Sequence, residues 1–479
     1  MKKFLSLILA LSMLFLSASC AEKEGGGQII GSGEEETKAE FTSKYADMAE
    51  SNTLPVLSSE NFKVSVSMFS YYFNCIYHNH VDSGETNIDP KTSLKEQTYS
   101  GTYSWFDYII YETSDNVKIK LYLAEEAIDA GMTLSDEDYK KIDEEITKID
   151  NNAKALGIST ALNIKNYYSS SVDETSIRKC LELTALAEKY NKEVLDPKYI
   201  FTDEDYEEYF KKSPNDYLAM NYIQYLIPAD KGNAEAEKQF AACKTAEEFT
   251  ALIESRLATD YPDMKAEDYD KNIATLFTYN QYYSKDSTFA EWAYDAERKP
   301  YDVYVKTNDN GITYLAMMLP ASNDTHSEVL YRDITPVHNV YAIAFLEDDY
   351  GDAEKAKAQA EAVAENARGG SDMASLCTMY GGGSMSNITR GDAPTAVEEW
   401  IFDENRVADE VGTVTVEGVG TYVIKMRADG DLAWKYFCAV DMTNEIYNND
   451  LTAFQAKHPI GVDNDAVAYV TEINEAAEE

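Results

Sequence analysis

Few side chains in this 479-residue sequence stand at spacings that catalysis or metal binding requires. His78 and His80 lie near Cys75, but helical residues two apart do not share a face, so they are interpreted as polar residues at a helix end. Glycines 381–383 are not followed by the Lys-Ser or Lys-Thr of a phosphate-binding loop, so we expect a flexible loop there. No serine has a nucleophile motif around it, and the acidic pair at 348–349 lacks the spacing of a calcium loop. The sequence therefore predicts no metal site and no cofactor.

The thiol of Cys20 is the group for which the sequence predicts covalent chemistry. Lys2 and Lys3 precede an apolar run over residues 4–16, and the small residues 17–19 come directly before Cys20. This order is typical of a secretory signal peptide, and the run is shorter than the roughly 20 residues of a membrane-spanning helix. Residues 1–19 are therefore predicted to be removed. The position of Cys20 resembles that of the lipidated cysteine in a bacterial lipobox, although position 17 is Ser where Leu is more usual. An ordinary signal peptide followed by a chance cysteine is the alternative.

The acidic composition limits the possible partners. The formal net charge is −43, and removal of residues 1–19 makes it −45 because two lysines and no acids are lost. Such a surface repels phosphate backbones, so nucleic acid is excluded as a partner. Basic, unfolded polypeptides would be attracted to it, although the charge is equally consistent with solubility alone.

The first half of the chain is predicted to be a tether followed by helices. Residues 20–60 begin with Gly- and Glu-rich sequence typical of a flexible tether. Within residues 61–216, a long helix ends at Gly131, and Ser135 begins another. The second helix carries an apolar face at spacings of three and four, formed by Ile142, Ile146, Ile149, Ala153 and Leu156.

The second half contains an internal duplication. Residues 291–298 and 399–406 match in register at Glu, Trp, Asp and Arg. Each copy has a β-prone run and a helical stretch before this motif, and a Gly-centred turn and a strand after it. We therefore expect two related domains, at 217–320 and 331–438, followed by a C-terminal segment at 439–479. Trp292 and Trp400 are interpreted as core anchors.

Each copy resembles the parvulin prolyl-isomerase domain. The order is a strand, an Ala/Glu/Lys-rich helix, a short helix led by an aromatic residue, then a Gly turn and a last strand. The preceding region resembles the chaperone domain of SurA- and PrsA-type foldases at residues 105–108, 126–138, 186–190 and 202–210. The resemblance implies an α+β fold in which a helical chaperone domain is followed by two parvulin-like domains. It also implies that the C-terminal segment returns to pack on the helical domain.

The usual isomerase residues are missing from both copies. Prolyl isomerisation has a barrier of about 18–20 kcal/mol, and its catalyst needs an apolar proline pocket and groups that favour the twisted amide. Parvulins resemble one another in having two histidines on central strands and an aromatic residue in the pocket. His338 is the one histidine close to these positions, and it lies four residues before the nearest of them. The matching positions are Tyr225, Thr313 or the adjacent Tyr314, and Phe289 in copy one, and Ala342, Tyr422 and Val397 in copy two.

The resemblance implies a foldase or chaperone held by lipid at the outer face of a bacterial cell membrane. Its partners would be unfolded or extended exported polypeptides, and isomerase activity would be weak or lost. Two alternatives stay open: an active prolyl isomerase, and a peptide- or solute-binding or surface-interaction lipoprotein.

Overall fold

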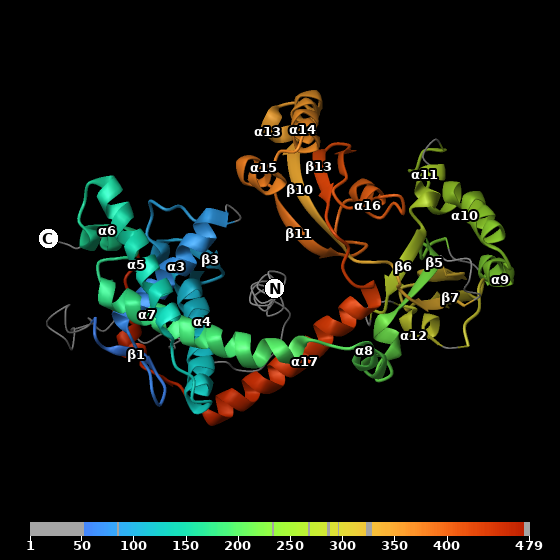
Figure 1. Ribbon diagram of the computed structural model, residues 1–479. Coiled ribbons are helices and arrows are strands. Elements are labelled where there is room, and N and C mark those ends of the chain that lie inside the picture. The colour runs from blue at the N-terminus through green and yellow to red at the C-terminus, as the bar shows by residue number, and fades with distance from the viewer. Residues whose placement is uncertain are drawn as a thin grey trace. The chain divides into compact units, whose positions relative to one another are not determined.

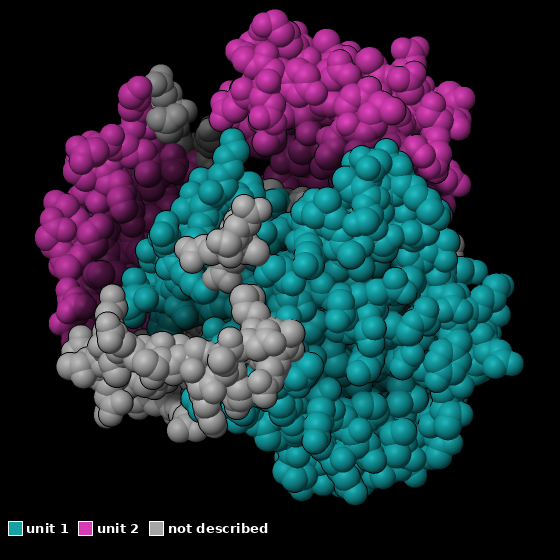
Figure 2. Space-filling model, turned by 90° about the vertical axis from the view of Figure 1, so that its left-hand side faces the viewer, with its two compact units in different colours: residues 1–200, 444–479 teal, residues 201–443 magenta. Residues whose placement is uncertain are grey.

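The computed structural model describes residues 52–83, 86–231, 234–266, 269–284, 288–295, 297–321 and 328–473. The predicted signal peptide, Cys20 and most of the predicted tether lie outside these residues. The protein is α+β, with helices and several small antiparallel sheets (Figure 1). It forms two compact units, coloured separately in Figure 2: unit 1 is residues 1–200 with 444–479, and unit 2 is residues 201–443.

Unit 1 is mainly helical. Side-chain caps begin its longer helices: Ser104 and Ser135 each form a capping box with an Asp three residues on. Gly131, where the sequence predicts a helix end, has a φ of +72°. The helices are α3 (Val66–Ser83), α4 (Trp105–Asp129), α5 (Asp136–Leu156), α6 (Thr160–Tyr167), α7 (Glu174–Tyr190) and α18 (Asn464–Val467). Shorter turns are η1 (Leu94–Glu96), η2 (Asn191–Leu195) and η3 (Asp196–Tyr199), and the short strands are β1 (Pro55–Ser58), β2 (Lys63–Ser65), β3 (Thr98–Ser100), β4 (Tyr103–Ser104) and β14 (Gly461–Val462).

The predicted apolar face of α5 is correct along most of its length. Ile142, Ile146 and Ala153 are buried, and Ile149 is partly buried against the cluster that contains Ile146. Leu156 is 61% exposed, so its assignment to the buried face was wrong. It is the last residue of α5, before Gly157 turns the chain away with a φ of +70°.

The C-terminal segment completes the core of unit 1. Strand β14 pairs with β1, and β1 pairs with β2. Phe454, Ala466 and Val470 belong to the apolar cluster formed by α3, α4 and α7. The buried carboxylate of Glu472 accepts hydrogen bonds from the Leu94 amide and hydroxyl of Ser93, at 2.8 and 2.5 Å. The return of this segment to the helical part of the chain, which the family resemblance implies, is therefore present.

Unit 2 contains two sheets with the same strand order. The first is β6-β5-β8-β7 and the second is β11-β10-β13-β12, all antiparallel. The strands of the first are β5 (Leu218–Ile227), β6 (Phe277–Tyr282), β7 (Val303–Thr307) and β8 (Thr313–Leu319), with β9 (Leu330–Arg332) pairing to β5. Those of the second are β10 (His338–Leu346), β11 (Gly383–Ile388), β12 (Val411–Val416) and β13 (Gly420–Met426).

The two sheets also share fine structure, which supports the predicted duplication. Asn221 donates to the carbonyl of Pro320 (3.0 Å) and accepts from the amide of Asn280 (2.8 Å). Asn339 makes the equivalent bonds to residues 428 and 387, at 2.7 and 2.9 Å. Asn280 and its counterpart have φ values of +55° and +58°, each beside a register shift in the strand pair.

Helices cover both faces of each sheet. The first sheet packs α9 (Ala234–Ala242) and α10 (Ala246–Asp260) on one face and α12 (Ala290–Ala293) on the other. The second sheet packs α14 (Ala353–Arg368) and α15 (Met373–Tyr380) on one face and α16 (Thr395–Ile401) on the other. The remaining helices are α8 (Asp203–Phe210), η4 (Pro214–Tyr217), α11 (Tyr269–Ala274), α13 (Glu347–Tyr350) and α17 (Ala433–Lys457), which crosses the boundary between units along the chain.

One expectation for this region was wrong, and another holds. The glycines at 381–383 do not form a flexible loop: Gly381 ends α15 with a φ of +73°, and Gly383 begins β11, which pairs with β10. The motif tryptophans are half-buried, and each packs against the core cluster of its own sheet, in agreement with their interpretation as anchors. The arginine of the same motif lies over each indole ring. The guanidinium of Arg298 is 5.0 Å from the ring centroid of Trp292, and that of Arg406 is 4.5 Å from the ring centroid of Trp400.

Candidate functional site

An open hollow lies on the α12 face of the first sheet. Its volume is about 350 Å³. Strands β5 and β6 supply one part of the lining, and the start of α12 supplies another. The rings of Tyr222 and Phe289 meet edge to face within it, with centroids 5.0 Å apart. The described lining residues are Met220, Tyr222, Gln224, Gln281, Tyr282, Ser284, Thr288, Phe289 and Ala290.

Strand pairing corrects the alignment of the two copies by one residue. Tyr222 is paired with Met318, and its counterpart Val340 is paired with Met426 at the matching position of the second sheet. Counting along β5 and β10 from these pairs shows that Gln224, not Tyr225, is the counterpart of Ala342. Because side chains alternate between faces, this shift moves the predicted residue to the other side of the sheet.

Tyr225 and Thr313 therefore do not join Phe289 at the hollow. The Tyr225 hydroxyl donates to the buried carboxylate of Asp260 on α10 (2.8 Å). Burial and this hydrogen bond raise the pKa of Tyr225 far above its usual value. Thr313 donates to Glu237 on α9 (3.2 Å), again on the face away from α12. Tyr314, one residue on, is the counterpart of Tyr422 and lies on the same face as Gln224.

In copy two the three predicted residues do lie together. Val397 is buried in the cluster between the second sheet and α16, and Ala342 and Tyr422 pack against it. His338 stands where copy one has Met220, and its Nδ1 lies 2.7 Å from Asp429 Oδ1. Its ring also packs edge to face on Phe402, at 4.8 Å. This histidine is therefore held by a carboxylate at the end of the strand.

The lining of the copy-one hollow suits binding better than proton transfer. Tyrosine hydroxyls are the titratable groups among the described lining residues. General acid–base chemistry near neutral pH needs a group such as His, Glu or a perturbed Lys within reach of the substrate. The aromatic rings, a methionine and two amides instead offer apolar contact and hydrogen bonds.

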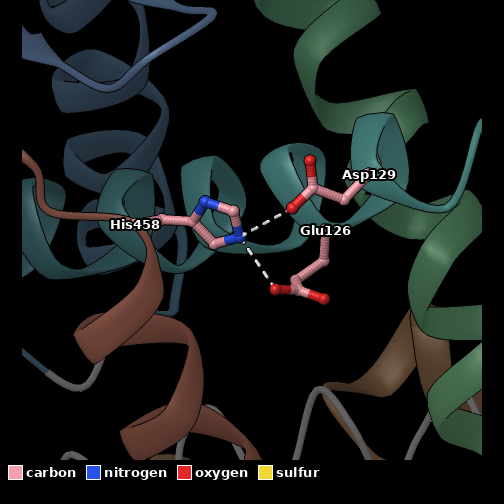
Figure 3. Close-up of side chains that lie close together, drawn as sticks. All are labelled: Glu126, Asp129 and His458. Carbon is pink, nitrogen blue, oxygen red and sulfur yellow. Dashed lines mark hydrogen bonds and ion pairs between the residues drawn. The ribbon is translucent and has the colours of Figure 1, made fainter.

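A second cluster, in unit 1, joins the end of α4 to the end of α17 and to His458, which follows it. His458 Nε2 lies 2.8 Å from Glu126 Oε1 and 3.7 Å from Asp129 Oδ2 (Figure 3). These three side chains have metal-ligand chemistry, and their nearest ligand atoms lie within 4.8 Å of one another. The ammonium of Lys457, however, already lies 2.7 Å from Glu126 and 2.9 Å from Asp129. The cluster is thus a salt-bridge network in which Lys457 is the cation.

Charge pairing sets the protonation of this cluster. Partial burial opposes ionisation of Glu126, but hydrogen bonds from Lys457 and His458 outweigh it and lower its pKa. The hydrogen bond from Lys457 lowers the pKa of Asp129. The same contacts with the two carboxylates raise the pKa of Lys457.

His78 and His80 are engaged separately. His80 Nε2 lies 2.7 Å from the Glu112 carboxylate, whereas the ring of His78 stacks on Tyr167 at 4.1 Å. This agrees with their interpretation as polar residues near a helix end. A sequence reading could not have found the Glu126–His458 cluster, because its members lie more than 300 positions apart.

Comparison of the chain with models of known protein families and with curated proteins finds no match. Within the part of the chain that the structure describes, no helix has the length and apolar character needed to cross a membrane.

Proposed function

We propose that this protein is a chaperone or foldase that binds unfolded exported polypeptides at the outer face of a bacterial cell membrane. In this proposal unit 1 is a SurA/PrsA-like chaperone domain, and the two sheets of unit 2 are the cores of parvulin-like domains. A lipid on Cys20 is the anchor, and mass spectrometry of the mature N-terminal peptide tests it. An unmodified peptide that begins elsewhere would remove the anchor from the proposal.

The observation that carries the proposal is the copy-one hollow. It is large enough for a few residues of an extended chain, and its lining combines aromatic rings with amides. The strand order of the sheet beneath it is repeated in copy two. A lining that combines aromatic rings with many hydrogen-bonding groups can accept many different sequences. The duplicated topology favours this proposal over a solute-binding protein, which needs one cleft between two lobes.

Chaperone activity is tested by aggregation of a reduced, unfolded client. We expect the full-length chain to suppress light scattering at a one- to severalfold molar excess, because client segments would occupy the hollow instead of one another. Bovine serum albumin at the same concentration is the control for general protein effects. Scattering that is no lower than with albumin would contradict the proposed function.

Isomerase activity is tested in a protease-coupled assay with a proline-containing peptide. Gln224 and Tyr314 in copy one, and Ala342 and Tyr422 in copy two, stand where parvulins have histidines, so we expect little increase over the uncatalysed rate. A strong rate that falls on Phe289→Ala would instead establish an active isomerase centred on the hollow.

A further inference from the structure

Two glutamine amides distinguish the copy-one hollow from the matching face of copy two. Gln224 projects from β5 and Gln281 from β6, and both line the hollow. A carboxamide offers both an N–H donor and a carbonyl acceptor, which are the groups that a peptide bond also presents. Gln281 donates one N–H to the carbonyl of the next residue, Tyr282 (3.0 Å), and this bond uses one of the two donors of its amide.

The counterparts of these amides in copy two are alkyl side chains. Met220 is paired with Gln281 in the first sheet, and His338 is paired with Ile388 in the second, so Ile388 stands where Gln281 does. The counterpart of Gln224 is Ala342. Ile388 is buried against α16, whereas Gln224 and Gln281 are partly exposed, so the two copies differ at these positions in exposure as well as in chemistry.

The two copies also differ in aromatic residues, which copy one has and copy two lacks at the matching positions. Phe289 of copy one, which meets Tyr222 in the hollow, is replaced by Val397 in copy two. Tyr222 itself is replaced by Val340, which is fully buried. Copy one therefore carries rings and amides at four positions at which copy two carries aliphatic groups.

We propose that the two copies have divided roles: copy one binds the client, with Gln224 and Gln281 hydrogen-bonding its backbone, and copy two is a structural domain. This inference rests on the proposed client-binding function and names its site and ligand class. The ligand is an extended peptide segment with an apolar side chain against Phe289, which lines the hollow together with Tyr222.

Fluorescence anisotropy with the full-length chain tests the assignment. The probe is the fluorescein-labelled peptide Ala-Ala-Pro-Phe-Ala-Ala amide. We expect Gln224→Ala and Gln281→Ala each to weaken binding about three- to tenfold, which is the range for loss of one hydrogen bond. Replacing the central Pro-Phe by Asp-Asp should weaken it at least tenfold. Tyr422→Phe, a conservative change on the matching face of copy two, is the control and should leave affinity within about twofold.

Thermal melts monitored by circular dichroism would show that the glutamine variants remain folded. Unchanged affinity in both folded glutamine variants, equal affinity for the Asp-Asp peptide, or an equal loss in Tyr422→Phe would each overturn the inference.

Photocrosslinking gives a readout that does not depend on substitutions. A benzoylphenylalanine in place of Phe in the probe should crosslink to residues 220–224, 281–284 or 288–290, and not to 338–342 or 388–398. Crosslinks mainly to the second set would overturn the division of roles. Aggregation suppression that survives in the folded double glutamine variant would defeat this inference while leaving the proposed function intact. Peptide binding at the hollow without any suppression of aggregation by the unmodified chain would contradict the proposed chaperone function while leaving the peptide site intact.

Discussion

Asp260 is a buried carboxylate in the core of the first sheet, and two side chains hold it. Arg256 contacts it through Nε and Nη2, both at 2.9 Å, and the Tyr225 hydroxyl adds a third bond at 2.8 Å. Arg256 is 16% exposed and Asp260 is fully buried at its side chain. Removing the carboxylate leaves a largely desolvated guanidinium, whereas removing the hydroxyl leaves the ion pair in place.

These contacts predict unequal losses of stability. Asp260→Ala should lower the free energy of unfolding by about 3 kcal/mol, and Tyr225→Phe by about 1.5 kcal/mol, measured by urea denaturation. Tyr304→Phe, which removes an exposed hydrogen bond to Thr288, is the matched control and should cost less than about 0.5 kcal/mol. Equal effects of the three variants would show that Asp260 is not an organising residue of this core.

The same tyrosine shows how far the site could be predicted. The sequence pattern located strand β5 and Phe289, which lines the hollow, but selected Tyr225 in place of its neighbour Gln224. Strand side chains alternate with a period of two, so an error of one residue exchanges core and site. The two copies share few residue types along this strand, and only the ladder of paired residues fixes the register.

At the scale of single elements, strand β12 and helix α16 meet through a glycine. A Cβ at Gly412 would lie 2.4 Å from the Trp400 ring, so the ring lies directly on the backbone. In copy one the corresponding residue is Tyr304, whose own ring contacts Trp292 at 5.4 Å. The two copies thus fill the same space, one with a glycine under the tryptophan and one with two rings.

Gly412→Ala is therefore expected to destabilise the second sheet by about 1–3 kcal/mol, because Trp400 must move to admit the methyl group. Chemical denaturation followed by tryptophan fluorescence measures both the stability and the displacement of the indole. Gly383→Ala on β11 is the control: its Cβ meets nothing within 4 Å, and its φ is not positive. A neutral Gly412→Ala would mean that the indole has another place to pack.

The elements predicted well are those with a strong apolar pattern or a clear cap. Strand β10, helix α14 and strand β13 follow the predicted order of a strand, an Ala/Glu/Lys-rich helix and a last strand after a Gly turn, and Asp352 caps α14. Strands β6 and β11 were not predicted. Their sequences, FTYNQY and GSMSNI, are polar, and hydrogen bonds to the edges of β5 and β10 define them. Pairing with a neighbouring strand leaves no trace in local composition.

The salt-bridge network of unit 1 joins residues far apart in the chain, so it affects the unit as a whole. Its members are Glu126, Asp129, Lys457 and His458. The lowered pKa values of the two carboxylates make their contribution to stability present above their ordinary values of 4.5 and 3.8. It is lost as pH falls through the lowered folded-state values. The raised pKa of Lys457 makes its contribution fully present below 10.5 and lost only as pH rises through its higher folded-state value.

Lys457→Ala should therefore lower the thermal midpoint of unit 1 by a few degrees between about pH 5 and 10, and by progressively less below about pH 4. Differential scanning calorimetry across this range measures the effect. Lys148→Ala, which removes an exposed helical ion pair with Glu145, is the matched control and should change the midpoint little. A Lys457→Ala effect that is the same at pH 3 and pH 7 would contradict an electrostatic role.

Unit 2 is inserted within the sequence of unit 1, and this has a consequence for the order in which the molecule can fold. Residues 201–443 form a continuous stretch, so unit 2 can complete itself as soon as that stretch has been synthesised. Unit 1 cannot, because β14 and the buried Val470 and Glu472 come from the final part of the described chain. Its apolar cluster stays incomplete until last. During synthesis, the two sheets of unit 2 would therefore be folded while unit 1 still exposes part of its apolar cluster. The growing chain would itself need protection from aggregation at that stage.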